Sequence, residues 1–173
     1  MTGLERFNAL TGPEAEAELF GCCESRRWAR RLARARPFST IDELLESAGQ
    51  IWDELPDEDR LEAFAAHPRI GERSSGRAAR EQSGTRGASE ETLAALARAN
   101  RDYEKRFGHI FIVCASGKSA QEMLDLCLGR IHNDPRMELQ LAFEEQKKIT
   151  RLRLMELMET RLPPSASLLP VGS

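Results

Sequence analysis

The sequence predicts an all-α fold, organised as a multi-helix bundle in a single domain. Apolar residues recur three and four positions apart through most of the chain, which is the spacing of one face of a helix. Residues that favour helix starts precede several of these stretches, and the alternating β-branched runs typical of strands are nearly absent. A length of 173 residues is enough to enclose one hydrophobic core.

Four helices are expected in the first part of the chain, each with a residue at its start that suits a helix N-terminus. These starts are Thr11-Gly12-Pro13, Ser25, Thr40 and Asp57. The first helix is expected to continue to about Cys22, and Pro37 ends the second. Glu43 follows Thr40 at the capping-box spacing. The third helix has the clearest apolar stripe, formed by Ile41, Leu44, Leu45, Ala48, Ile51, Trp52 and Leu55.

Three longer helices are expected in the second half. They begin at Ser89, Ser119 and Asp134-Pro135 and end near Arg106, His132 and Arg161. Phe107-Gly108 separates the first of them from the apolar segment 110–115, which is predicted to be a strand or a buried extended segment. We expect residues 1–162 to form the domain and residues 163–173 to be a flexible C-terminal tail.

Composition argues against several classes of partner. The formal net charge of −3 gives no general attraction to nucleic acid, and the longest apolar run, 110–115, is too short to span a bilayer. The N-terminus lacks the basic-then-apolar layout of a signal peptide. The four cysteines contain no C-x-x-C pair, which favours reduced thiols in the cytoplasm.

Six arginines lie between Arg26 and Arg36, and two interpretations are open for them. Such a run could bind phosphate groups. The positions 27, 30, 31 and 34 have helical spacing, however, and would form one solvated face paired with acidic side chains. The second interpretation is favoured.

The stretch from His67 to Ala88 contains four glycines and few apolar residues, which predicts a long loop with a helical turn around 77–82. Long loops in compact domains often carry function. Pro68 disfavours helical backbone at His67, so this histidine should lie at a helix end, where unpaired carbonyls favour a protonated imidazole. It is either a proton donor near neutral pH or a histidine that only hydrogen-bonds a carbonyl.

Two further sites could bind a ligand rich in amides. Glu81-Gln82 offers a carboxylate and a carboxamide, which could hold an N–H and a carbonyl of a ureide, although an ordinary solvated loop would look the same. The segment from Phe111 through Ile112, Val113 and Cys114 to Ala115 could offer backbone groups to a planar ligand, or could simply be core. The three histidines lack metal-site spacing, and no nucleotide-binding motif is present, so neither a metal nor a nucleotide is expected.

Taken together, several stretches resemble the OHCU decarboxylase family in their order and spacing. The stretches are FAAHPRIGE at 64–72, REQ at 80–82, YEKRFGHIFIVCA at 103–115, RIHN at 130–133 with Glu138, and Lys148-Ile149 with Arg151-Leu152. The resemblance extends from Cys22-Cys23 and Trp28 to about residue 160. OHCU is 2-oxo-4-hydroxy-4-carboxy-5-ureidoimidazoline, the intermediate of urate oxidation that precedes allantoin.

The resemblance implies an all-α protein that is commonly a homodimer and uses no cofactor. It implies that His67 is the catalytic histidine, that Glu81 is its acidic partner, and that Pro68, Gln82 and the backbone of 111–115 contact the substrate. Ala78 stands where the family often has a substrate-binding serine, so one hydrogen bond to the ligand is in question. Lys118 replaces an arginine that often follows Gly117 in the family.

The implied function is decarboxylation of OHCU to (S)-allantoin in urate catabolism. Electrons released with carbon dioxide can flow into the adjacent C5=N bond, so the reaction needs no cofactor as an electron sink. His67 would assist departure of the carboxylate or supply a proton, while Glu81 would hold ureido or ring N–H groups. Two alternatives are a non-catalytic helical interaction module of the same fold and a lyase acting on a related ureide.

Overall fold

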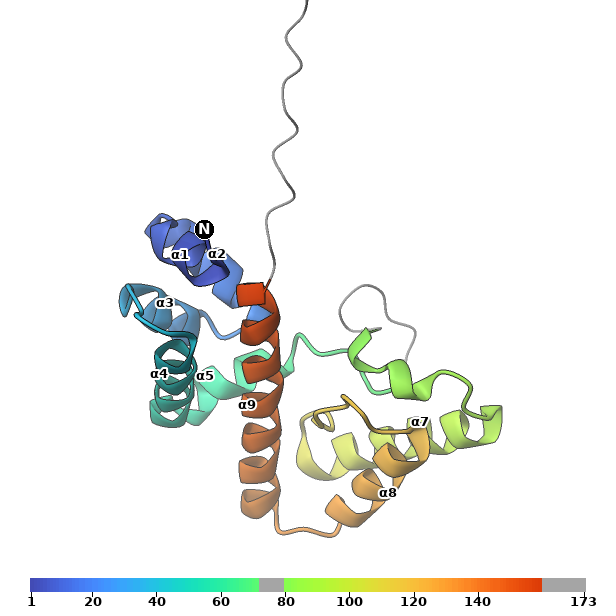
Figure 1. Ribbon diagram of the computed structural model, residues 1–173. Coiled ribbons are helices and arrows are strands. Elements are labelled where there is room, and N and C mark those ends of the chain that lie inside the picture. Colours follow the sequence, from blue (N-terminus) through green and yellow to red (C-terminus); the bar gives the residue numbers. More distant parts are fainter. Residues whose placement is uncertain (72–79, 160–173) are drawn as a thin grey trace, which may run out of the picture.

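The computed structural model describes residues 1–71 and 80–159, and within these ranges the chain forms helices and irregular segments but no strand (Figure 1). The predicted all-α fold is therefore confirmed. The helices are α1 (Gly3–Ala9), α2 (Gly12–Cys22), α3 (Arg26–Arg34), α4 (Ile41–Glu54), α5 (Asp57–Phe64), the short 3-10 helix η1 (Ser83–Thr85), α7 (Glu90–Phe107), α8 (Ala120–Arg130) and α9 (Pro135–Glu159).

Most helix starts are capped as the sequence predicted. The side-chain oxygens of Thr11, Ser25, Thr40, Ser89 and Ser119 each accept a hydrogen bond from the backbone N–H three residues later. The carboxylate of Glu43 accepts from the N–H of Ser39 instead of Thr40, so only half of that predicted capping box forms. Each such cap satisfies an N–H that the first turn leaves without a helical partner.

One expectation about a helix start was wrong, and one helix was not predicted. Asp57 does not cap α5, because the cap position is Pro56 and no side chain bonds the helix start; the Asp57 carboxylate pairs with Arg60 instead. Helix α1 was not predicted, although Thr2 and Glu5 form a complete capping box there. Its seven residues bury only Phe7, which leaves too short an apolar pattern to identify from periodicity.

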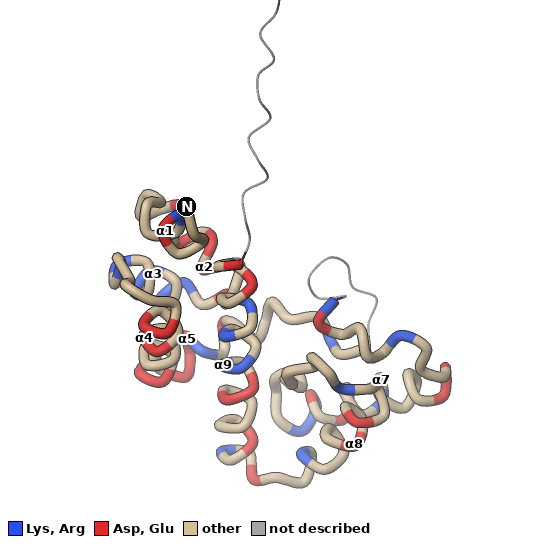
Figure 2. The backbone as a smooth tube through the Cα atoms, viewed as in Figure 1, with Lys and Arg blue, Asp and Glu red and all other residues tan. Residues whose placement is uncertain are grey.

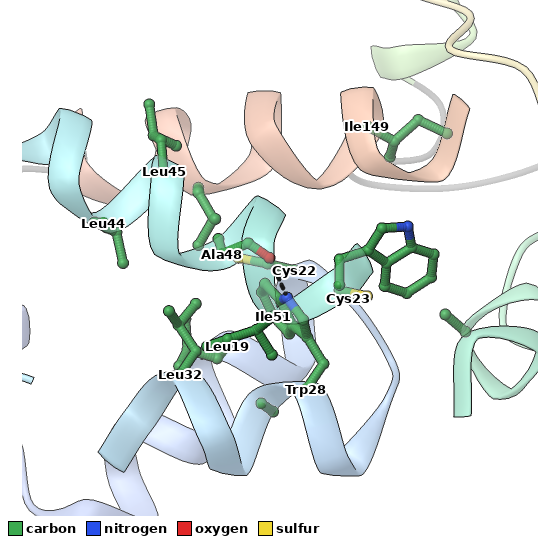
Figure 3. Close-up of a cluster of buried hydrophobic side chains, with 14 of the residues drawn as sticks. Leu19, Cys22, Cys23, Trp28, Leu32, Leu44, Leu45, Ala48, Ile51 and Ile149 are labelled. Atoms are coloured by element: carbon green, nitrogen blue, oxygen red, sulfur yellow. Dashed lines mark hydrogen bonds between the residues drawn. The ribbon is translucent and has the colours of Figure 1, made fainter. Parts of the chain in front are cut away.

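The buried side chains form two clusters, and the helix α9 contributes to the larger of them. In Figure 1, α9 stands between the N-terminal helices α1–α5 and the pair α7 and α8. The larger cluster joins α1–α5 to α9, and it includes the fully buried Trp28, whose indole N–H donates to the carbonyl of Ala48 at 3.0 Å (Figure 3). The smaller cluster joins α7 and α8 around Leu96, Tyr103 and Met123. Segment 110–115 is irregular, with Ile110 partly buried and residues 111–115 buried, so it is a buried extended segment and not a strand.

The arginines of α3 form a charged outer face, as expected (Figure 2). They pair with acids on neighbouring helices: Arg26 with Glu62, Arg27 with Asp59, Arg30 with Glu16 and Arg31 with Glu54. Arg36, beyond the helix, donates to the carbonyls of Phe7 at 2.8 Å and Leu10 at 2.9 Å. Five of the six arginines in this run therefore pair with acids or carbonyls, which supports the second interpretation.

The four cysteines are buried thiols that form no disulfide. Burial raises the pKa of Cys23 to about 12 and that of Cys127 to about 11, so both remain thiols near neutral pH. Across residues 1–71 and 80–159, no helix has the length and apolar character needed to cross a membrane.

Candidate active site

A cavity of about 350 Å³ lies where the segment after α5, residues 80–82, segment 111–116 and α9 come together. This volume falls in the range of small-molecule sites. Of the ten predicted site residues, nine line this cavity: His67, Pro68, Glu81, Gln82, Phe111, Ile112, Val113, Cys114 and Ala115. The tenth, Ala78, lies outside the described residues. Residues from four separated parts of the sequence therefore converge on one pocket.

His67 lies three residues beyond the end of α5, with its backbone N–H donating to the carbonyl of Phe64 at 3.1 Å. Its ring Nε2 lies 2.6 Å from Oε1 of Gln146 on α9. Burial lowers the pKa of His67, and the positive charge of Arg153 lowers it further, against smaller opposing effects of Gln146 and Glu81. The expectation of a protonated imidazole was therefore wrong: desolvation and a nearby cation outweigh the helix end.

Glu81 forms a two-pronged ion pair with Arg153 of α9, whose Nε and Nη2 lie 2.7 and 2.8 Å from the two carboxylate oxygens. Both side chains are largely shielded from solvent, with 27% and 12% exposed. Within the described residues no hydrogen bond joins Glu81 to His67, so the carboxylate acts on the imidazole through its charge alone. A bidentate arginine pair fixes the carboxylate in the pocket wall.

Gln82 is buried and supports the loop that carries His67. Its Oε1 accepts from the N–H of Gly71 at 3.1 Å, and nearby Asn100 of α7 donates to the carbonyl of Ile70 at 2.8 Å. Gly71 has a φ of 86°, a left-handed conformation that favours glycine. Because the amide oxygen of Gln82 holds this turn, its NH2 group is the end left to meet a ligand. Of the helical turn predicted at 77–82, residues 80 and 81 are helical, and residues 77–79 lie outside the described residues.

Segment 111–115 is held from one side by three charged side chains. Arg130 donates to the carbonyl of Ile112 at 2.8 Å, Glu145 accepts from the N–H of Cys114 at 3.4 Å, and Lys118 donates to the carbonyl of Cys114 at 2.9 Å. Val113 lies between Ile112 and Cys114, and its own N–H and C=O bond to no other described residue. The segment therefore presents an unused donor and acceptor within a pocket wall.

The sequence reasoning missed the contribution of α9, above all Gln146 and Arg153. These two residues are seven positions apart and, with Ile149, follow the i, i+3, i+7 spacing of one helix face. A buried glutamine and a mostly buried arginine on an otherwise apolar stripe were the available signal. Among the described residues, no group of three or more potential metal ligands occurs.

Comparison with known proteins gives one consistent family. The family model described as OHCU decarboxylase matches residues 8–155. The uric acid degradation bifunctional protein TTL of Arabidopsis thaliana is 40% identical over 152 residues, which are 81% of this chain and 46% of that protein. The chain thus spans about half the length of this relative. The 2-oxo-4-hydroxy-4-carboxy-5-ureidoimidazoline decarboxylase of Amia calva is 33% identical over 72% of this chain and 75% of that protein.

Solved structures agree with the sequence comparison. A crystal structure of OHCU decarboxylase in the presence of (S)-allantoin superposes with a TM-score of 0.76 at 40% identity, covering 83% of this chain and 98% of the other. A structure of (S)-allantoin synthase has a TM-score of 0.73 at 20% identity, which supports the fold alone.

Proposed function

The chain belongs to the OHCU decarboxylase family, and we propose that it converts OHCU to (S)-allantoin and carbon dioxide in urate degradation. One observation carries the proposal. His67, Glu81, Gln82 and segment 111–115, from separate parts of the chain, line a single pocket of suitable size. The structure solved in the presence of (S)-allantoin is covered over 98% of its length by 83% of this chain, and this likeness supports the proposal.

The reaction needs one bond cleavage and three proton movements. The bond between C4 and the carboxylate breaks, its electron pair forms the C4=C5 bond, and the C5=N electrons move to nitrogen, which takes a proton. The enol at C4 then loses its hydroxyl proton to become a carbonyl, and C5 takes a proton. One proton is consumed overall. The substrate's own C5=N bond accepts the electrons, so we propose that the enzyme uses no cofactor.

His67 is proposed to be the base for the C4 hydroxyl. Its lowered pKa favours the neutral imidazole at neutral pH, and a neutral ring has a nitrogen lone pair that accepts a proton. The proton taken from the hydroxyl can then be returned to C5. Delivery from one side of a fixed ring would give a single allantoin enantiomer.

The other pocket groups are proposed to orient the ring. The Glu81 carboxylate, fixed by Arg153, is suited to accept ureido N–H groups, and the NH2 of Gln82 to donate to a carbonyl. The free N–H and C=O of Val113 match an amide in the ring. Pro68, Ile149 and Leu152 add apolar surface that excludes water from the reacting atoms. A substrate held in this way has little freedom to react from the wrong face.

The test is the rate and optical activity of the product from freshly generated OHCU, followed by circular dichroism. The protein should give optically active allantoin faster than the spontaneous racemic decay. His67→Asn should lower kcat at least ~10²-fold, because general acid–base catalysis contributes about that much or more. Near-normal turnover by a folded His67→Asn variant would refute the role of His67. No acceleration by the parent protein would favour a non-catalytic module, and turnover of another ureide alone would favour a related lyase.

We also propose that the protein is a cytoplasmic homodimer. Four cysteines that form no disulfide suit a reducing compartment. Large apolar side chains are exposed on α8 and early α9, among them Leu128, Met137 and Leu141, and such residues suit a subunit contact. Light scattering coupled to gel filtration should give about twice the 19.4 kDa chain mass, and a monomer mass would contradict it.

A further inference from the structure

We propose that Gln146 is a positioning residue that holds His67 as the Nε2–H tautomer, with Thr150 fixing the orientation of the Gln146 amide. This inference rests on the proposed function, in which His67 is the base. Gln146 does not line the pocket and so acts through the imidazole. Its side chain is fully buried, with 0% exposed.

The first step is the contact between the two side chains. His67 Nε2 and Gln146 Oε1 are 2.6 Å apart, just below the usual range of N–H···O distances. A flipped amide would place an NH2 group against the ring nitrogen, and N–H···N contacts are longer than this. The ring therefore donates from Nε2 to the amide oxygen.

The second step is what keeps the amide from flipping. Gln146 Nε2 donates to Oγ1 of Thr150, one helical turn along α9, at 3.1 Å. An amide NH2 group only donates, so the hydroxyl oxygen of Thr150 accepts from it, and the amide oxygen of Gln146 is left facing His67.

The consequence concerns the second ring nitrogen. With the proton held on Nε2, the neutral ring has its lone pair on Nδ1, which bonds to no described residue. The charged groups that face His67 are Arg153 from α9 and Glu81 from 80–82, and they pair with each other. An uncharged amide next to Nε2 fixes the tautomer without adding the negative charge that would protonate the ring.

The direct test is ¹⁵N NMR of the histidine-labelled wild-type protein above the pKa of His67. Nε2 should show the shift of a protonated nitrogen and Nδ1 that of an unprotonated one. The reverse assignment, or a mixture of tautomers, would overturn the inference. This readout needs no turnover, so it fails or succeeds separately from the proposed function.

Two substitutions of Gln146 test the consequence for activity. Gln146→Glu places a carboxylate beside the ring, which should raise the pKa of His67 and move the acid limb of kcat/KM up by about 1–3 pH units. Gln146→Met, similar in shape, should lower kcat about 10- to 100-fold with little change in KM. If Gln146 only supported the fold, its substitution would change neither the acid limb of kcat/KM nor the tautomer of His67.

Thr150 supplies the matched pair of controls. Thr150→Val keeps the shape and removes the acceptor, so the amide of Gln146 can rotate and the His67 tautomers should mix, with kcat about 10-fold lower. Thr150→Ser keeps the hydroxyl and should retain the wild-type tautomer of His67 and the wild-type kcat. Equal behaviour of the valine and serine variants would contradict the proposal.

Discussion

Two buried polar clusters flank segment 111–115, and they differ in charge. One joins Glu138, fully buried on α9, to Tyr103 of α7 and Arg130 of α8. The Glu138 carboxylate accepts from the Tyr103 hydroxyl, from Arg130 Nε at 2.8 Å and from Asn133 Nδ2 at 3.0 Å. The other joins His67 to Gln146 and Thr150 and carries no full charge.

The difference shows which cluster is suited to hold structure and which to do chemistry. In the charged cluster each carboxylate oxygen has a partner, and burial followed by the Glu138 carboxylate raises the pKa of Tyr103, which keeps the phenol a donor. Arg130 also bonds the carbonyl of Ile112 and lies over the Phe111 ring at 4.7 Å. The neutral cluster leaves Nδ1 of His67, a residue that lines the pocket, without a hydrogen bond to any described residue.

The largest predicted effect comes from breaking the charged cluster. Arg130→Met should lower the free energy of unfolding by about 3–5 kcal/mol, because it leaves the carboxylate of Glu138 buried without its cation. Urea unfolding followed by far-UV circular dichroism measures this. The double variant with Glu138→Leu removes both charges and should recover part of the loss. A cost below about 1 kcal/mol for Arg130→Met would contradict the structural role.

Removing a charge at the pocket should affect activity more than stability. Glu81→Gln loosens Arg153 and the ligand-binding wall, so kcat/KM should fall about 10²-fold, the scale expected for misplaced reacting groups. The unfolding free energy should fall by less than the ~3–5 kcal/mol expected for a fully buried pair, because 27% of the Glu81 side chain is exposed and the glutamine amide oxygen can still accept from Arg153. Since the Glu81 charge raises the pKa of His67, its removal should also move the acid limb of the profile to lower pH.

Glu156→Gln is the matched control, since Glu156 pairs with Arg80 at the more exposed rim of the same pocket. It should change kcat/KM no more than a few-fold. Comparable losses in the Glu81 and Glu156 variants would mean that the pocket responds to net charge and not to the fixed position of Glu81.

The contrast between the clusters also explains what the sequence could reveal. Helices were predictable because their signals are local: the Thr11 and Ser119 caps and the stripe of α4 lie within a few residues of each other. His67, Glu81 and Gln82 were found through motif order and family resemblance. Gln146 and Arg153 were not, because their role depends on partners 79 and 72 residues away, a distance over which helical periodicity says nothing.

The pKa direction of His67 was mistaken for the same reason. A helix end is visible in the sequence, but the burial of the ring and the approach of Arg153 exist only once α9 packs beside the loop. Burial of the ring by residues distant in the sequence therefore lowers the pKa of His67 more than the helix-end carbonyls raise it. Helix α1 was missed for a different reason: its capping box is visible in the sequence, but its apolar pattern is too short.

The smallest predicted effect is the pH dependence of stability that His67 confers. Because folding lowers the pKa of His67 from its ordinary value of 6.5, the unfolded chain binds a proton more readily. The contribution to stability is therefore complete above about pH 6.5 and is lost as the pH falls through the lower, folded-state value. Urea unfolding of the wild type and of His67→Asn between pH 5 and pH 8 should show curves that run parallel above this range and converge below it. Curves that stay parallel throughout would mean that the ring is solvated in the folded protein. His67 would then not belong to an uncharged, buried cluster, and the contrast with the Glu138 cluster would fail.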